Sequence, residues 1–287
     1  MPSSLSLSRM PGTRRGILVA AAAATVLALG LTGCSTAQSP APSADDAAAS
    51  EGLAHVHGAY TDPQNGTLLL ASHHGLFDAT TEPAAKIGPT IDLMGFTADA
   101  NGTFYASGHP GPGTDLPNPV GLIKSTDGGE SWTPLSRQGE SDFHALTTTR
   151  GGIVGFDGRM RTSADGLEWT LVADAPAPYA LAGSPEHDVV LATTEEGLWR
   201  SEDGGRTWTL PAGGPVMLTA AFIDNLTVAA VTPGGGVYVS DDAGKTWTKA
   251  GQVQRQPSAV TGMRADEGQI TVWVVGAEGS TERLDIP

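Results

Sequence analysis

The feature of this sequence that most restricts its fold is a short motif that occurs four times at an almost constant spacing. Three copies fit the pattern Ser-x-Asp-x-Gly-x-x-Trp and begin at Ser125, Ser201 and Ser240; a fourth, which begins at Ser163, is one residue short. The aspartates of the four copies lie at positions 127, 165, 203 and 242, so they are 38, 38 and 39 residues apart. A period near 40 residues, with strand-like runs between turns, is typical of the blades of a β-propeller.

Each copy of the motif has a local structural role. The Asp side chain can accept backbone N–H groups inside a tight hairpin turn, and the Gly takes the positive φ that such a turn needs. The Trp then opens the next strand and buries its ring against the neighbouring sheet. The motif resembles the BNR or Asp-box repeat of sialidases and many other propellers, which implies a place on the hairpin between the third and fourth strands of a blade, away from the ligand-binding mouth of the channel. We therefore expect a structural role for Asp127, Trp132, Asp165, Trp169, Asp203, Trp208, Asp242 and Trp247.

Alignment on these motifs predicts an all-β fold with a single β-propeller domain over residues 53–287. Six blades are expected, and seven remain the alternative. Blade 2 contains an insertion rich in Gly and Pro, from Gly108 to Pro119. The chain ends on the third strand of the sixth blade, so the outer strand of that blade either comes from the N-terminal segment or is missing. The inner strands are predicted to begin near His55, Asp92, Asp142, Pro178, Met217 and Ala259.

The first 33 residues do not belong to this fold. A short basic region is followed by an apolar run from Ile17 to Leu31, about 15 residues, which suits the core of a signal peptide better than a membrane span of about 20. The run ends in Leu31-Thr-Gly-Cys34, which resembles the lipobox of bacterial lipoprotein precursors. The resemblance implies cleavage before Cys34, acylation of its thiol and a lipid anchor on the extracytoplasmic face of the cell membrane.

This region also predicts an export route and a linker. Thr13-Arg-Arg-Gly-Ile-Leu18 resembles a twin-arginine export motif, so that route is an alternative to unfolded secretion. Residues 34–52 are rich in Ala, Ser, Pro, Gln and Asp and are predicted to form a flexible tether between the lipid and the propeller. Because Cys34 is the only cysteine, we expect no disulfide bond.

The charge of the chain limits its partners. The sequence has 16 Lys and Arg residues, and the signal peptide would remove Arg9, Arg14 and Arg15; the remaining 13 face 31 acidic residues, a net charge of −18. Such a surface argues against nucleic acid and anionic lipid headgroups as partners and is compatible with cations.

Six of the seven histidines lie between residues 55 and 144, within the first three blades. Side chains two apart on a strand share a face, so His55 with His57, and Asp142 with His144, should point the same way. The loops after the second strands should bring further histidines to the same mouth of the channel. Imidazole, carboxylate and thioether groups gathered in this way favour a transition metal, copper or zinc. The predicted metal ligands are His55, His57, His73, His74, His109, His144 and Met94.

Several segments of the histidine-rich blades together resemble a group of bacterial lipoproteins described as glycosyl-hydrolase-like or exo-sialidase-like, over essentially the whole mature chain. That resemblance implies glycoside hydrolysis, for which candidate carboxylates are Asp92 with Asp142 and Glu195 with Glu196. True sialidases, however, use an arginine triad and a Tyr nucleophile. No arginine lies on the aligned inner-strand positions, and alternation predicts that Tyr179 points away from the mouth. The segments are His55-Val-His-Gly58, Ser72-His-His-Gly-Leu-Phe77, Leu93-Met-Gly-Phe96, Ser107-Gly-His-Pro110 and Glu140-Ser-Asp-Phe-His144.

Three functions therefore stay open on the sequence alone. The first is a lipid-anchored propeller that binds a transition metal at a histidine-rich mouth. The second is an exo-sialidase-like glycoside hydrolase that uses carboxylates at that mouth and acts on a glycan. The third is a non-catalytic scaffold for an envelope protein, because an acidic face would suit a basic partner.

Overall fold

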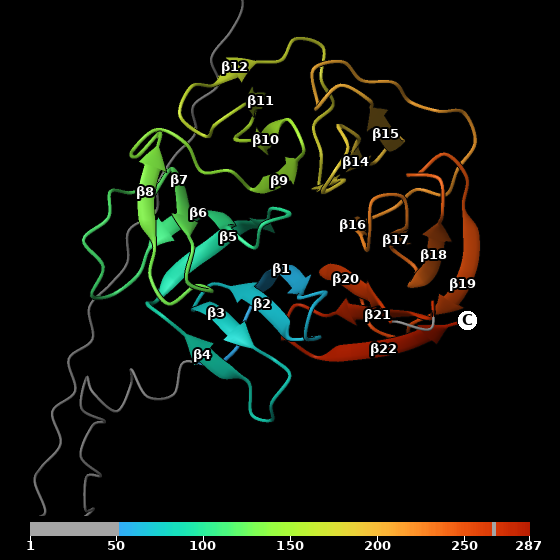
Figure 1. Cartoon of the computed structure of the whole chain (residues 1–287), viewed down its shortest axis with the longest axis horizontal. Coiled ribbons are helices and arrows are strands. Elements are labelled where there is room, and N and C mark those ends of the chain that lie inside the picture. Colours follow the sequence, from blue (N-terminus) through green and yellow to red (C-terminus); the bar gives the residue numbers. More distant parts are fainter. Residues whose placement is uncertain (1–51, 266–267) are drawn as a thin grey trace, which may run out of the picture.

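The computed structural model describes residues 52–265 and 268–287, and this part of the chain is all-β (Figure 1). Its strands form six antiparallel sheets arranged in a ring, each in simple sequential order. The predicted single six-bladed propeller is therefore confirmed, and the seven-bladed alternative is wrong. The predicted signal peptide, the lipidation of Cys34 and all but the last residue of the predicted linker lie outside the described residues.

Blades 1, 2, 3 and 5 have four strands, and blades 4 and 6 have three. Blade 1 contains β1 (Val56–Thr61), β2 (Leu68–Ser72), β3 (Gly75–Asp78) and β4 (Ala85–Ile87). Blade 2 contains β5 (Ile91–Ala98), β6 (Phe104–Pro110), β7 (Leu122–Ser125) and β8 (Thr133–Ser136). Blade 3 contains β9 (Ala145–Thr149), β10 (Gly152–Phe156), β11 (Met160–Ser163) and β12 (Thr170–Leu171).

The second half of the ring follows the same plan. Blade 4 contains β13 (Ala180–Gly183), β14 (Val190–Thr194) and β15 (Gly197–Ser201), and a single bridge between Arg200 and Thr209 stands where a fourth strand would pair. Blade 5 contains β16 (Thr219–Phe222), β17 (Val228–Val231), β18 (Gly236–Ser240) and β19 (Thr248–Gln252). Blade 6 contains β20 (Ala259–Arg264), β21 (Ile270–Val275) and β22 (Thr281–Ile286).

The ring closes between blade 6 and blade 1. Each inner strand contacts the next, and β20 contacts β1. The Val56 N–H donates to Ala277 O (2.8 Å), and the Ser258 hydroxyl donates to Val56 O (2.6 Å). Leu53 packs into the hydrophobic cluster that Val56 shares with Val275. Within the described residues no fourth strand pairs with β22, so closure depends on these contacts rather than on a shared sheet.

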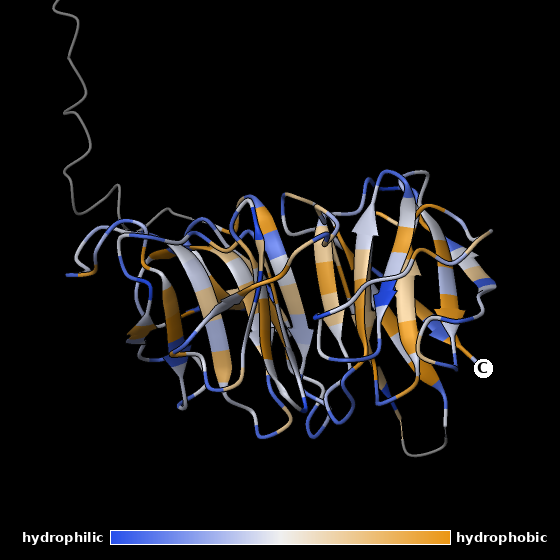
Figure 2. Cartoon of the chain, turned by 90° about the horizontal axis from the view of Figure 1, so that it is seen from above, coloured by the Kyte–Doolittle hydropathy of each residue, from blue (hydrophilic) through white to orange (hydrophobic). Residues whose placement is uncertain are grey.

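The hydrophobic core lies between the blades rather than inside any one of them. Strand interiors are apolar, while the loops at both ends of the ring are hydrophilic (Figure 2). Clusters of buried residues join the facing sheets of neighbouring blades, as Leu76 of blade 1 and Leu93 of blade 2 do. As predicted, the motif tryptophans add to these clusters; Trp169 stacks on the fully buried Phe143 with ring centroids 4.7 Å apart. Folding of each blade is therefore coupled to its neighbours.

The Asp-box turns have the predicted geometry. In the last copy, the Ser240 hydroxyl donates to Asp242 Oδ1 (2.8 Å) and accepts the Gly244 N–H (2.9 Å). Asp242 Oδ1 accepts the N–H groups of Lys245 (3.0 Å) and Thr246 (2.8 Å), and Oδ2 accepts the Thr246 hydroxyl (2.7 Å). Burial acts in the opposite direction, but these hydrogen bonds prevail and lower the pKa of Asp242 to about 2. The turn therefore binds the ionised carboxylate.

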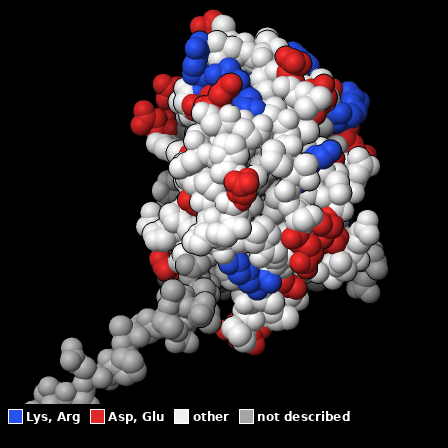
Figure 3. All heavy atoms as spheres, turned by 90° about the vertical axis from the view of Figure 1, so that its left-hand side faces the viewer, with Lys and Arg blue, Asp and Glu red and all other residues white. Residues whose placement is uncertain are grey.

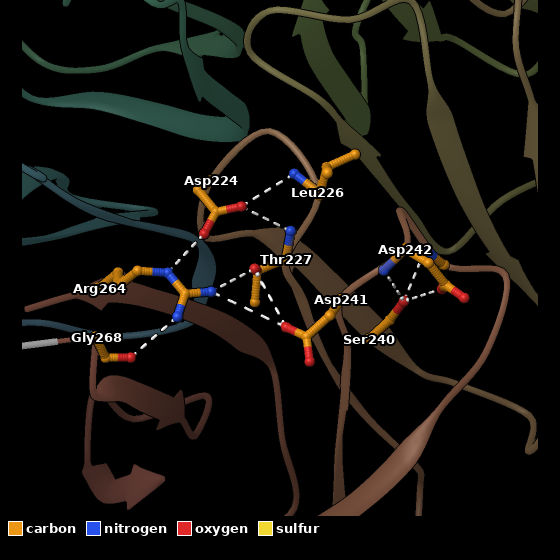
Figure 4. A network of polar contacts seen from close by, with 9 residues as sticks. Asp224, Leu226, Thr227, Ser240, Asp241, Asp242, Arg264 and Gly268 are labelled. Carbon is orange, nitrogen blue, oxygen red and sulfur yellow. Dashed lines mark hydrogen bonds and ion pairs between the residues drawn. The ribbon is translucent and has the colours of Figure 1, made fainter. Parts of the chain in front are cut away.

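A separate polar network ties blade 5 to blade 6 next to this turn (Figure 4). Arg264 donates from Nε to Asp224 Oδ2 (2.9 Å), from Nη2 to the Thr227 hydroxyl (2.6 Å) and from Nη1 to Gly268 O (3.0 Å). The Asp241 carboxylate lies 4.0 Å from the same guanidinium. Because one side chain bonds two blades, it fixes their relative position at the edge of the ring.

On the outer side of the ring, around blades 1 to 3, acidic and basic groups are scattered in small clusters of both signs between uncharged residues (Figure 3). Among the residues that the structure describes, no helix is long and apolar enough to cross a membrane.

Candidate metal centre

A cavity of about 580 Å³ runs along the axis of the ring and is lined by the six inner strands. Three of the predicted site residues line it: His57 from β1, Met94 from β5 and His144, which precedes β9. Irregularities in the strands accompany two of these positions. The pairing of β1 shifts between Val56 and Gly58, and that of β5 shifts between Leu93 and Gly95. Such bulges re-aim a side chain, and they are frequent beside functional sites.

Glycine makes the second of these bulges possible. Gly108 of β6 has a φ of 144°, and a Cβ there would lie 1.9 Å from Asp92 O. Asp92 and His109 face each other across the same pair of strands. A side chain at position 108 would therefore displace the backbone that carries Asp92. At the opening of β1, His55 has a φ of 51°, a conformation that few non-glycine residues adopt.

The structure brings His57, His73 and Asp92 together. One ligand atom from each residue lies within 4.8 Å of the other two. The His73 ring stacks against the His57 ring with centroids 4.7 Å apart, and against the His55 ring at 4.9 Å. His73 Nε2 lies 3.9 Å from Asp92 Oδ1. Residues from β1, the β2–β3 turn and β5 thus meet at one point.

Two buried polar atoms of this cluster lack partners. His57 Nε2 and Asp92 Oδ1 are buried and have no hydrogen bond, which is rare for buried polar atoms. Burial, helped by the neighbouring imidazoles of His73, His55 and His144, lowers the pKa of His57 to about 4. Burial, together with the charge of Asp142, raises the pKa of Asp92. The cluster therefore combines the neutral imidazole of His57 with a carboxylate that is desolvated.

A second group lies beside it. Asp142 Oδ2 is 2.6 Å from His144 Nε2 and 3.2 Å from His109 Nε2, while Asp142 Oδ1 is buried without a partner. The sequence predicts that Asp142 and His144 share a face because they are on one strand. That reason is wrong, since β9 begins only at Ala145, but the two side chains do meet.

Asp142 is held from both sides. Ser141 and Phe143 are fully buried. The Ser141 hydroxyl donates to Asp157 Oδ2 (2.5 Å), and the Phe143 N–H donates to the Ser107 hydroxyl (2.9 Å). These anchors were missed by reasoning from the sequence, because serines far apart in the chain give no pattern that would predict them.

The remaining predicted residues lie elsewhere. The His74 Nδ1–H donates to Gly52 O (2.9 Å), and no contact joins this ring to the other histidines among the described residues. Met94 lines the cavity. Glu195 and Glu196 are exposed in the β14–β15 turn, as expected, but are not joined to Asp92 or Asp142. The prediction that Tyr179 points away from the mouth is wrong, since Tyr179 lines the cavity. Its N–H donates to Thr193 O, which gives Tyr179 the position in blade 4 that His144 has in blade 3.

Comparison with known proteins agrees with the architecture. The family model described as BNR/Asp-box repeat matches residues 238–249, which include the motif around Asp242. No curated protein matches the sequence at a significant level.

Among solved structures, the GH74 enzyme of Niastella koreensis is 20% identical with a TM-score of 0.57; the match covers 82% of this chain and 36% of that one. The GH74 xyloglucanase of Xanthomonas campestris is 16% identical with a TM-score of 0.58, over 82% and 37%. Virginiamycin B lyase of Staphylococcus aureus is 12% identical with a TM-score of 0.51, over 82% and 85%. The chain thus spans little more than a third of the two GH74 proteins, and the likeness concerns the propeller fold.

Proposed function

We propose that this Asp-box β-propeller binds a transition metal ion, copper or zinc, at the mouth of its channel through His57, His73 and Asp92. The observation that carries the proposal is that two buried atoms of this set, His57 Nε2 and Asp92 Oδ1, have no hydrogen-bond partner. An unpaired buried polar atom costs about 1–3 kcal/mol. A cation bound by both atoms would remove that cost.

The chemistry of the donor atoms favours this class of ion. Two imidazoles and one carboxylate are a common ligand set for zinc and also suit copper. With a pKa of about 4, His57 is neutral at pH 7 and keeps the lone pair that a metal needs. The thioether of Met94, in the same cavity, would favour copper if it moved to the ion.

The test is metal binding by protein purified without a histidine tag. Zinc and copper are titrated by equilibrium dialysis against the wild type, His73→Ala and His74→Ala. The two histidines are neighbours in one turn, but only His73 belongs to the cluster, so His74→Ala is the matched control. We expect His73→Ala to weaken binding at this site at least about tenfold and His74→Ala to leave it unchanged. Equal binding by wild type and His73→Ala would refute the proposal.

A second candidate function is glycoside hydrolysis by Asp92 and Asp142. The raised pKa of Asp92 favours it, because a general acid must hold its proton near neutral pH. Turnover of a panel of chromogenic glycosides, sialosides included, would support this candidate if Asp92→Asn and Asp142→Asn each abolished it. No turnover by the wild type on any substrate of the panel would count against it.

We also propose that the chain is anchored by lipid at Cys34 on the extracytoplasmic side of the cell membrane, where it would meet metal ions, glycans or an envelope partner. The support is the lipobox sequence Leu31-Thr-Gly-Cys34. Metabolic labelling with a fatty-acid analogue should mark the wild type and not Cys34→Ala. Equal labelling of both would contradict the anchor. A pull-down from envelope extracts that recovers only background proteins would count against a scaffold role.

A further inference from the structure

We infer that the channel mouth holds a second metal ion, bound by Asp142, His109 and His144. This inference rests on the proposed function, because it extends the same centre from one ion to two. It concerns a different set of side chains, however, so the two ideas can fail separately.

The contacts of His109 set one hydrogen-bond acceptor against another. Its Nδ1 lies 2.8 Å from Asn118 Oδ1, an oxygen that can only accept, so Nδ1 carries the hydrogen. In the neutral ring Nε2 then carries the lone pair, and it faces Asp142 Oδ2 at 3.2 Å. Two acceptors at that distance repel each other unless a cation or a proton lies between them. The hydrogen bond from a ligand's other ring nitrogen is also how proteins orient metal-binding histidines.

The surroundings of Asp142 also suit an ion. One of its oxygens, Oδ2, is approached by two imidazoles, and the other, Oδ1, is buried with no partner. Its backbone is fixed by the buried neighbours Ser141 and Phe143, whereas the side chains of His109 and His144 are 42% and 60% exposed. A carboxylate on a fixed backbone, between an imidazole oriented by Asn118 and a second, more exposed one, is suited to bind an ion.

The spacing of the donor atoms can be compared with that of a zinc site. Zinc bonds of about 2.0–2.1 Å at tetrahedral angles place neighbouring donor atoms about 3.3 Å apart. The 3.2 Å between Asp142 Oδ2 and His109 Nε2 is close to that value. The 2.6 Å between Asp142 Oδ2 and His144 Nε2 is a hydrogen bond, so the exposed His144 ring would have to turn to bind the ion. The second ion would also balance charge, because the negative charge of Asp142 acts on Asp92 and one ion would serve each carboxylate.

The experiment measures stoichiometry. Tag-free wild type, the double variant His109→Ala/His144→Ala, the single variant His73→Ala and the control His187→Ala are titrated with zinc and assayed by elemental analysis after dialysis. His187 lies in the β13–β14 turn and contacts Asn225, so it tests the effect of removing a histidine as such. We expect two ions in the wild type and in His187→Ala, and one ion in each of the other two proteins. Thermal unfolding in the presence of a chelator checks that all four are folded.

The outcomes separate the two proposals. One ion in the wild type that persists in His109→Ala/His144→Ala and is lost in His73→Ala would overturn the second site and leave the proposed function standing. One ion that persists in His73→Ala and is lost in the double variant would overturn the proposed function and keep this set as the only site. No bound zinc in the wild type would refute the second site, and no bound zinc or copper would refute both.

Discussion

Removal of one carboxylate from an Asp-box turn should cost the whole propeller a large part of its stability, and Asp242→Ala is the sharpest case. The Asp242 side chain accepts two backbone N–H groups and two hydroxyls at 2.7–3.0 Å. A hydrogen bond to a charged group contributes about 1.5–3 kcal/mol. Because the turn is near the surface and water can replace part of each bond, we expect a total loss of about 2–4 kcal/mol in the free energy of unfolding.

Two other aspartates of the chain, Asp165 and Asp241, serve as comparisons for Asp242. The shortened copy at Asp165 has one good bond, from the Leu167 N–H (2.8 Å), and two long ones of 3.3 Å. Asp165→Ala should therefore cost less than about half as much as Asp242→Ala. Asp241, next in sequence to Asp242, has a side chain that is 80% exposed, so Asp241→Ala should change stability by less than about 0.5 kcal/mol.

The pH dependence provides a second check on Asp242. Its folded pKa of about 2 lies below the value of about 3.9 expected in the unfolded chain. A carboxylate with a lowered folded pKa contributes stability that is present above about pH 4 and is lost as the pH falls towards 2. The difference between wild type and Asp242→Ala should thus shrink over that range.

Urea unfolding followed by tryptophan fluorescence at pH 7, 4 and 3 measures these quantities. An equal loss for Asp242→Ala and Asp165→Ala, or a difference that is the same at every pH, would refute the argument that the ionised carboxylate holds the turn. A change in the urea dependence of unfolding would indicate that the folded or unfolded state itself had changed.

Three further predictions follow from the packing and can be checked with the same unfolding assay. Phe143→Ala should cost about 3–5 kcal/mol, because the ring is fully buried and stacks on Trp169. Arg264→Met should cost about 1–2 kcal/mol, because it removes three hydrogen bonds from a half-exposed side chain; no loss would mean that water replaces the network in Figure 4. Gly108→Ala should both destabilise the fold and weaken metal binding, because its Cβ would meet Asp92 O at 1.9 Å; unchanged binding would show that the bulge is not needed.

The fold could be read from the sequence because its information is local and repeated. Each Asp-box binds its own turn through residues at most four positions apart, so one motif predicts one hairpin. Four copies then fix the period, and the period fixes the architecture. Ring closure could not be predicted in the same way, since it depends on contacts such as Ser258 with Val56, which are 202 positions apart.

The candidate site could be predicted only as a region. The concentration of histidines in blades 1 to 3 predicted that several of them would meet at one mouth of the channel, but their grouping in the structure depends on features without a sequence signature. The bulges at His57 and Met94 alter strand alternation, and Asn118 reaches His109 from within a loop insertion. His73 and His74 are adjacent and identical in type, yet only one joins the cluster, since the turn directs their rings differently.

The residue just before the inner strand can be compared among blades 3 to 6, which shows whether the fold requires a particular side chain there. His144, Tyr179, Leu218 and Ser258 each donate their N–H to the second strand of their own blade, at 2.7–3.0 Å. The backbone is therefore the same in blades 3 to 6, while the side chain changes from imidazole to phenol, alkyl and hydroxyl. This backbone position therefore does not itself require a histidine.

This equivalence predicts that His144→Ser, which gives blade 3 the residue of blade 6, leaves the free energy of unfolding of the metal-free protein within about 0.5 kcal/mol of wild type. Its exposed side chain supports that expectation, since it is 60% accessible to solvent. Zinc binding by the set that contains Asp142 should nevertheless be lost. If this variant unfolded in the absence of metal, the imidazole of His144 would have a structural role. The comparison of equivalent residues among the blades would then be wrong.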